Sequence, residues 1–139
     1  DKDTYSFDAK TGKWKTKFNP ENYKAKNFSE EVTDAKTGNV VIKLGDKINF
    51  LSAKKLATDG LKDILVSQES LIGKYLHNEV KVSDDEEEGT FGIGTELNDT
   101  IIKQILDSWY IYKSLDYFLK KSIISRTDLH LSFRKTRKN

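Results

Sequence analysis

Residues 31–49, EVTDAKTGNVVIKLGDKIN, are the stretch that decides the fold. Two short runs, Glu31–Thr33 and Val40–Leu44, flank the five residues Asp34–Gly38, and strand-forming residues on either side of a turn that ends in glycine are typical of a β-hairpin. Aspartate at the start of such a turn can bond the backbone ahead of it, and glycine takes the positive φ angle. The stretch therefore predicts an antiparallel hairpin, followed by a second turn at Gly45–Lys47.

The pentapeptide DAKTG also occurs earlier in the chain, at Asp8–Gly12. Aromatic residues lead into this turn at 5–7, and apolar residues or threonine alternate with lysines at 14–18 after it. A two-residue period around a glycine turn indicates a hairpin with one solvated face. The sequence thus predicts two hairpins built on the same turn.

A short helix and a returning strand are expected after the second hairpin. Residues 52–60 predict the helix, with Ser52 as its N-cap and Gly60 just beyond its end. Leu61–Ser67 is apolar enough for the strand.

Residues 27–66 and 75–115 follow one pattern, which predicts a structural duplication. Each contains a strand, a polar turn, a strand, a glycine turn and a helix, and Asn98 is expected to cap the second helix. The aligned positions include Glu31-Val32 with Glu79-Val80, Val41–Ile48 with Thr90–Leu97, Asn49 with Asn98, and Leu56 with Ile105, and we expect these last two to be equivalent buried positions.

The expected fold class is α+β and β-rich, with two similar strand-turn-strand-helix units in one small sandwich-barrel-like module. A single short helix cannot cover a sheet, so we expect the two units to pack together. The expected parts of the chain are an N-terminal hairpin and connector at 1–26, the duplicated module at 27–118 and a basic, weakly ordered tail at 119–139.

Composition excludes several classes of function. The 139 residues include no cysteine, which excludes disulfides, thiolate metal sites and thiol nucleophiles, and only two histidines, which excludes a histidine-rich metal site. No apolar run approaches the 18 residues that a membrane helix needs. Methionine is absent and no signal peptide opens the chain, so we expect a cytoplasmic domain that is part of a longer protein.

Two loops invite a ligand-binding interpretation that the sequence does not favour. The acidic run Asp84–Glu88 lacks the spacing of a calcium loop, and mutual repulsion of its carboxylates favours a solvated turn. Gly92-Ile93-Gly94 lacks the Lys-Ser/Thr ending of a phosphate-binding loop, and a turn between a strand and a helix needs glycine in any case. We interpret both as structural.

Lys10 and Lys36 each lie in an exposed turn, as the modified lysine of a carrier domain does, but their alanine and threonine neighbours are not those of such domains. His77 and His130 lack a nucleophile elbow, the G-x-S-x-G motif, that would point to a catalytic triad. No catalytic, cofactor-binding or metal-ligating residue is therefore assigned.

The C-terminal residues 126–139 hold five basic residues and one aspartate. Basic side chains around Phe133 could neutralise a few phosphates, so the candidate nucleic-acid-binding residues are Arg134, Lys135, Arg137 and Lys138. Few residues there could pack in a core, and we expect about 125–139 to be poorly ordered.

The segment from about Trp14 to Ser108 resembles the β subunit of bacterial DNA-directed RNA polymerase. The resemblance lies in the repeated strand, D-x-x-T-G turn and strand, in GDKI and GTEL before each helix, and in LIGKYL between the copies. It is similar to the insertion module in the second lobe of that subunit. After Ser108 the resemblance weakens, and the apolar residues 109–119 are expected to form a closing strand followed by a short helix.

This resemblance implies a non-catalytic peripheral insertion that serves as a scaffold or a regulator-contact surface in transcription. It implies the other polymerase subunits (β′, α, ω and σ), DNA and RNA as partners through the parent enzyme, a nucleotidyltransferase. The resemblance also implies that the Mg²⁺ of the parent enzyme is bound by residues outside this segment. The alternative is a free-standing small nucleic-acid-binding domain that uses the basic C-terminal tail.

Overall fold

The computed structural model describes residues 2–23, 26–27, 30–82, 89–119 and 129–135. It forms two compact units. Unit 2 is the continuous segment Asp8–Ser67, and unit 1 combines Asp1–Phe7 with Gln68–Asn139. Unit 2 is therefore inserted, along the chain, between the first strand of unit 1 and the rest of that unit.

Unit 2 contains an antiparallel sheet in the order β2-β7-β4-β5. Trp14 of β2 lies opposite Val66 of β7, and Thr33 of β4 lies opposite Leu65 of β7. The expected strand at 61–67 is therefore confirmed as β7. The strands are β2 Lys13–Lys17, β4 Val32–Asp34, β5 Val40–Ile42 and β7 Asp63–Val66, and a separate pair joins β3 Lys26–Asn27 to β6 Lys47–Ile48.

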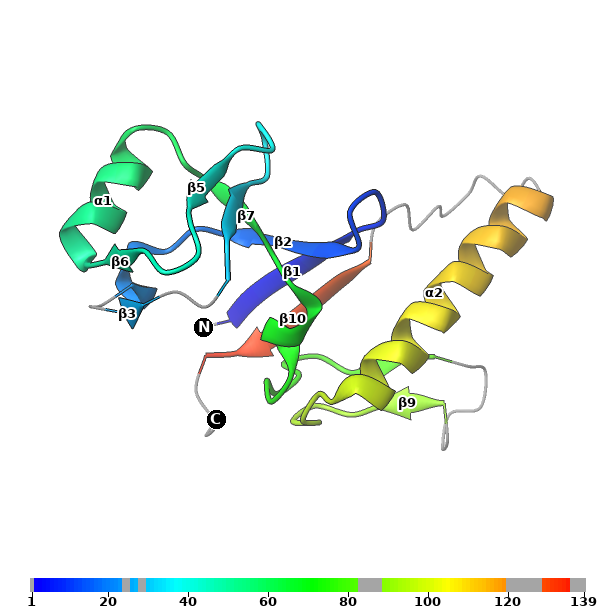
Figure 1. Ribbon diagram of the computed structural model, residues 1–139. Helices are drawn as coiled ribbons and strands as arrows, with labels where there is room; N and C mark the ends of the chain where they lie inside the picture. The colour runs from blue at the N-terminus through cyan, green and yellow to red at the C-terminus, as the bar shows by residue number, and fades with distance from the viewer. Residues whose placement is uncertain (1, 24–25, 28–29, 83–88, 120–128, 136–139) are drawn as a thin grey trace. The chain divides into compact units, whose positions relative to one another are not determined.

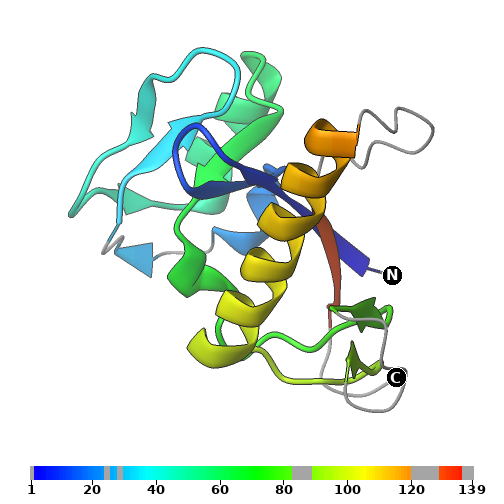
Figure 2. The same cartoon turned by 90° about the vertical axis from the view of Figure 1, so that its right-hand side faces the viewer.

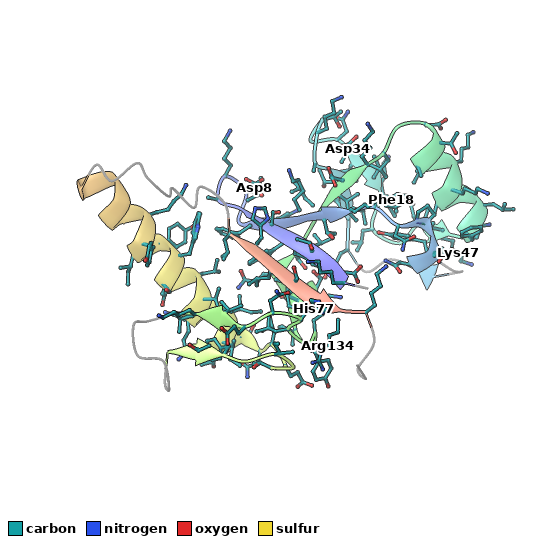
Figure 3. The ribbon with its side chains drawn as sticks, turned by 180° about the vertical axis from the view of Figure 1, so that it is seen from behind. Asp8, Phe18, Asp34, Lys47, His77 and Arg134 are labelled. Carbon is teal, nitrogen blue, oxygen red and sulfur yellow. The ribbon has the colours of Figure 1, made fainter. Side chains whose placement is uncertain are left out.

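The two DAKTG turns share several hydrogen bonds, and the first turn adds one from Thr11 Oγ1 to Asp8 Oδ2 at 2.9 Å. The amide of Gly12 donates to the Asp8 carbonyl at 2.8 Å, and the amide of Gly38 donates to the Asp34 carbonyl at 2.9 Å. Each aspartate carboxylate also accepts the amide of the lysine two residues ahead, and both glycines have positive φ angles, 72° and 78°. Both predicted turns are confirmed, and Figure 3 labels the aspartate that begins each one.

Helix α1, Phe50–Thr58, begins three residues earlier than expected. The Asn49 side chain accepts the backbone amide of Ser52 at 2.8 Å, so Asn49 is the N-cap and the assignment of that role to Ser52 was wrong. Gly60, with a φ of 114°, follows the end of the helix as expected. Figure 1 shows α1 at the end of unit 2 that carries β3 and β6.

The core of unit 2 lies between its sheet and α1. The one-turn helix η1, Pro20–Asn22, leads to Tyr23, whose ring lies 5.0 Å from that of Phe18. Trp14 and Ile42 are fully buried. The clustered core residues are Phe18, Tyr23, Val32, Ile42, Ala53, Leu61 and Ile64.

Unit 1 is held together by strands that are far apart in sequence. Strand β1, Lys2–Asp8, pairs antiparallel with β10, His130–Arg134, so that Lys2 lies opposite Arg134. Only the last residue of β1 belongs to unit 2. Unit 1 also contains the short strand pair of β8 Val80–Lys81 and β9 Thr90–Phe91, the one-turn helix η2 Gln68–Leu71, and helix α2 Asp99–Leu119.

Helix α2 runs without a break from Asp99 to Leu119, as Figure 2 shows. The Asn98 side chain accepts the amide of Ile101 at 2.9 Å, which confirms Asn98 as the cap. The expected closing strand within 109–119 was wrong. The segment contains neither glycine nor proline, so nothing in it ends the helix.

The closing strand of unit 1 is β10, in the tail that we expected to be poorly ordered. Leu131 is 1% exposed and Phe133 is fully buried, while His130 and Ser132 alternate with them. The Phe133 ring packs edge-on against Tyr5 at 5.5 Å. For residues 129–135 the expectation of few core contacts was therefore wrong. The alternation turns Leu131 and Phe133 into the core, while the backbone of β10 pairs with β1. The rest of the tail, 120–128 and 136–139, lies outside the described residues.

The core of unit 1 joins β1, β10 and the first half of α2. The Trp109 ring meets that of Phe7 edge-on at 5.4 Å. A bridge pairs Leu76 with Phe133. The buried apolar residues of unit 1 are Phe7, Leu71, Leu76, Leu97, Ile102, Ile105, Trp109, Leu131 and Phe133.

The aligned segments 27–66 and 75–115 share local structure at several positions. Val32 lies opposite Ile42, and their aligned partners Val80 and Phe91 also lie opposite each other. Ile105 is buried at 2% exposure but the aligned Leu56 is only half-buried, so the expectation of two equivalent buried positions holds for Ile105 alone. A common origin of these two segments stays a prediction.

The fold class is confirmed in its coarse form: the described part of the chain is β-rich, with two α-helices and antiparallel strands. Within unit 2 the described strands form an open sheet, because β2 and β5 at its ends do not pair with each other. The described strands therefore do not close into a barrel.

Candidate functional site

Two of the four candidate nucleic-acid-binding residues lie at the end of β10. The backbone amide of Arg134 donates to the Tyr75 carbonyl at 2.9 Å. Its guanidinium lies over Gly94, where an added Cβ would be 3.6 Å from Nη1. Figure 3 shows Arg134 close to the segment that carries His77.

Lys135, next in the chain, has its Nζ 3.9 Å from Oδ1 of Asp3. Both side chains of this pair are partly exposed, so the contact contributes little to stability. Arg134 and Lys135 are consecutive in the chain, but their side chains have different neighbours within unit 1, Gly94 for Arg134 and Asp3 for Lys135. Arg137 and Lys138 lie outside the described residues.

The two histidines lie on or beside β10. The backbone amide of His77 donates to the Ser132 carbonyl at 2.8 Å, which extends the strand pairing. His130 is exposed, and its Nδ1 lies 2.7 Å from Oγ of Ser6 across the β1–β10 pair. A serine–histidine contact is one part of a hydrolytic site, but no described carboxylate bonds to the other ring nitrogen. We interpret the contact as a cross-strand hydrogen bond.

The glycine loop of unit 1 has a structural explanation. The amide of Thr95 donates to the Gly92 carbonyl at 3.2 Å, and Gly94 has a φ of 88°. Gly45 occupies the aligned position in unit 2 with a φ of 85°. The loop is a tight turn whose second glycine lies under the Arg134 guanidinium, and the acidic run 84–88 lies outside the described residues.

Lys10 and Lys36 both have exposed side chains on the two DAKTG turns. Across the described ranges no three histidine, aspartate or glutamate side chains are grouped as a metal site would require. No described helix is long and apolar enough to cross a membrane.

Several exposed apolar side chains were not singled out from the sequence. Leu44 is 66% exposed and Ile93 is 62% exposed, at aligned positions in the two glycine turns. The alignment of the two turns was the signal that could have found this pair. Ile111 and Tyr112 are 61% and 67% exposed on α2, where the apolar residues had been assigned to a strand.

Comparison with known proteins finds relatives for about half of the chain. Over 63 residues, 45% of this chain, it is 51% identical to the DNA-directed RNA polymerase subunit beta of Rickettsia bellii. It is 43% identical over 68 residues to that of Rickettsia conorii, and 41% identical over 78 residues to that of Rickettsia akari. This part of the chain is homologous to the RNA polymerase β subunit. The resemblance to the β subunit inferred from the sequence is thereby confirmed over about half of the chain.

The matched segment covers only 5–6% of the length of these β subunits. No family model matches the chain. The identity therefore shows a relationship to the polymerase β subunit and does not by itself define the role of so small a segment.

Proposed function

We propose that this chain is a non-catalytic peripheral insertion module of an RNA polymerase β subunit, a scaffold or regulator-contact surface in transcription. The observation that carries the proposal is the 41–51% identity to β subunits over about half of the chain. The finer fold assignment, a sandwich-barrel-like insertion of two similar units, is part of the same proposal.

Two structural features support a module that is separate from the catalytic centre. Each unit has its own buried core, so its fold does not depend on residues of a distant active site. Tyr110, Ile111 and Tyr112 are neighbouring apolar side chains on α2 that are 46%, 61% and 67% exposed, and a contiguous exposed apolar patch is a feature of protein-contact surfaces.

The partners proposed for the module follow from the parent enzyme. The β′, α, ω and σ subunits, DNA and RNA would be met through the complete β subunit in the cytoplasm. The nucleotidyl transfer and its Mg²⁺ would be supplied by residues outside this chain.

The test uses a polymerase whose β subunit carries this segment, compared with one from which residues 8–67 are deleted. We expect both enzymes to assemble and to add nucleotides at rates within about twofold of each other, because a peripheral module touches no reacting atom. The isolated 139-residue chain, given template, Mg²⁺ and nucleotides, should make no RNA above background.

Either of two results would contradict the proposal. Failure of the deleted enzyme to assemble would place the segment in the structural centre of the polymerase. An assembled enzyme that has lost nucleotide addition would show that the segment takes part in catalysis.

A further inference from the structure

The positive charge of the folded body is concentrated in unit 2. Asp8–Ser67 contains twelve lysines and eight acidic residues, a net charge of +4. The rest of the chain contains twelve basic and fourteen acidic residues, a net charge of −2, which together give the +2 of the whole. Unit 2 therefore carries an excess of lysine that the basic C-terminal tail does not explain.

Four of these lysines form a row along β2 and the turn before it, which we call the β2 lysine row: Lys10, Lys13, Lys15 and Lys17. No acidic residue lies between Asp8 and Glu21. Lys10, Lys15 and Lys17 are exposed and Lys13 is half-buried.

The core fixes where this row points. Trp14 is fully buried and Phe18 is 3% exposed, and they alternate with the lysines along the strand. Since successive side chains of a strand point to opposite faces, burial of these two rings turns Lys13, Lys15 and Lys17 to the other face. Alternate residues of a strand lie roughly 6.6–6.8 Å apart, so the backbone positions of Lys13, Lys15 and Lys17 are evenly spaced along one face.

The charges of the row are not neutralised by ion pairs with described residues. The ion pairs within the described part of the chain are Lys103–Asp107 and Lys135–Asp3, and both belong to unit 1. Lys17 does lie opposite Asp63 of β7, which reduces the local potential at that end. Lys15 lies opposite Leu65, an uncharged neighbour that is 8% exposed.

Strand β1 of unit 1 has no such row. On β1 the outward positions include Thr4 and Ser6, whose hydroxyls meet Ser132 at 3.3 Å and His130 at 2.7 Å across the strand pair. Phe7 of β1 and Phe18 after β2 are both buried. A buried phenylalanine is thus present at both strands, whereas of these two strands only β2 carries a row of lysines.

We propose that the β2 lysine row binds the phosphodiester backbone of nucleic acid without reading its base sequence. Lysine is a flexible point charge suited to single phosphate contacts and lacks the planar fork that arginine uses for bidentate recognition. The aromatic residue within the row, Trp14, is buried and cannot stack on bases. A nucleic acid carries a phosphate at every nucleotide, so a row of lysines can bind at any register, whereas an acidic peptide must match its carboxylates to the row.

The test measures binding of the 139-residue chain to a fluorescent 20-base-pair duplex of mixed sequence by anisotropy, as salt is varied. Four neutralised phosphates give a slope of about −3.6 in log K against log salt, so affinity should fall about 150-fold between 50 and 200 mM salt. Substitution of all four row lysines by glutamine should remove most of this salt dependence.

A matched control changes the same number of charges elsewhere in unit 2. Lysines 36, 43, 47 and 55, replaced together by glutamine, lower the net charge equally and should leave most of the salt slope in place. A third variant, with glutamine at Arg134, Lys135, Arg137 and Lys138, tests the tail predicted from the sequence.

Three outcomes would overturn the proposal. The control variant could lose as much salt dependence as the row variant, the tail variant alone could lose binding, or a poly-glutamate peptide could bind more tightly than the duplex at equal salt. If the fourfold row variant does not fold, Lys10→Gln and Lys36→Gln decide the question, since they remove one charge from identical turns. Lys10→Gln should lower the slope by about 0.9 and Lys36→Gln should not.

Discussion

The two aligned segments, 27–66 and 75–115, begin in the same way, but the chain continues differently after each helix start. In both, a pair of short strands is followed by a glycine turn with a positive φ and by a helix that an asparagine caps. Helix α1 then ends after nine residues, ahead of Gly60, and the chain returns at once as β7. Helix α2 continues for 21 residues, and the returning strand β10 begins only at His130.

This comparison separates the signals that start a helix from those that stop it. Asn49 and Asn98 act on amides three residues ahead, so two aligned segments start their helices at the same place. Glycine after α1 supplies a backbone conformation that ends the helix, and residues 99–119 contain no glycine or proline. Repeated sequence therefore predicts helix starts here better than it predicts helix lengths.

The largest expected effect is on the free energy of unfolding when a buried residue of β10, the last strand of unit 1, is truncated. Strand β7, the last strand of unit 2, provides the comparison. Phe133 is fully buried, so Phe133→Ala should lower the free energy of unfolding by about 3–5 kcal/mol. Val66→Ala, at a half-buried position of β7, should cost clearly less. Urea unfolding followed by Trp109 fluorescence in a Trp14→Phe background reports on unit 1. A cost below about 1 kcal/mol for Phe133→Ala would mean that β10 is dispensable.

The second prediction compares aligned helix positions. Ile105→Ala should cost about 2–5 kcal/mol, since its side chain is 2% exposed, while Leu56→Ala should cost less because Leu56 is half-buried. Urea unfolding of each variant measures the two costs, with Trp14 as the probe for unit 2. Equal losses of unfolding free energy for the two variants would mean that the two positions are energetically equivalent in spite of their different burial.

The third prediction uses the identical turns. Gly12→Ala and Gly38→Ala should each cost about 1–2 kcal/mol, because a left-handed backbone is unfavourable for alanine. No atom lies within 4 Å of the added Cβ in either turn, so backbone strain is the whole effect and the two values should agree. Thermal unfolding followed by circular dichroism checks this. A difference above about 1 kcal/mol would show that the turns are not energetically equivalent.

The smallest expected effect concerns the caps. Asn49→Ala and Asn98→Ala each remove one acceptor from a helix start and should cost about 1 kcal/mol. Ser52→Ala is the control, because the hydroxyl first assigned as a cap is not the group that accepts the bond. Comparable losses for Ser52→Ala and Asn49→Ala in urea unfolding would return the cap to Ser52.

The parts of the fold that could be predicted from the sequence are those held by contacts between near neighbours. Both DAKTG turns, the Asn98 cap and the end of α1 at Gly60 depend on groups within four residues of one another. The relationship to the polymerase β subunit was also visible in the order of such local motifs. The candidate site was harder to predict, because charge counted along the chain pointed to the tail and away from the lysines of β2.

The sequence by itself determined where turns form and where helices start, since a side chain and a backbone group two or three residues away can satisfy each other in any surroundings. Only the tertiary structure decided that β10 is a strand and that β1 belongs to the same unit. Lys2 pairs with Arg134 across nearly the whole chain, and neither strand can hide its apolar face or satisfy its backbone without the other. Such a pairing leaves no local mark beyond the alternation of Leu131 and Phe133, which acquires its meaning only when β1 is beside it.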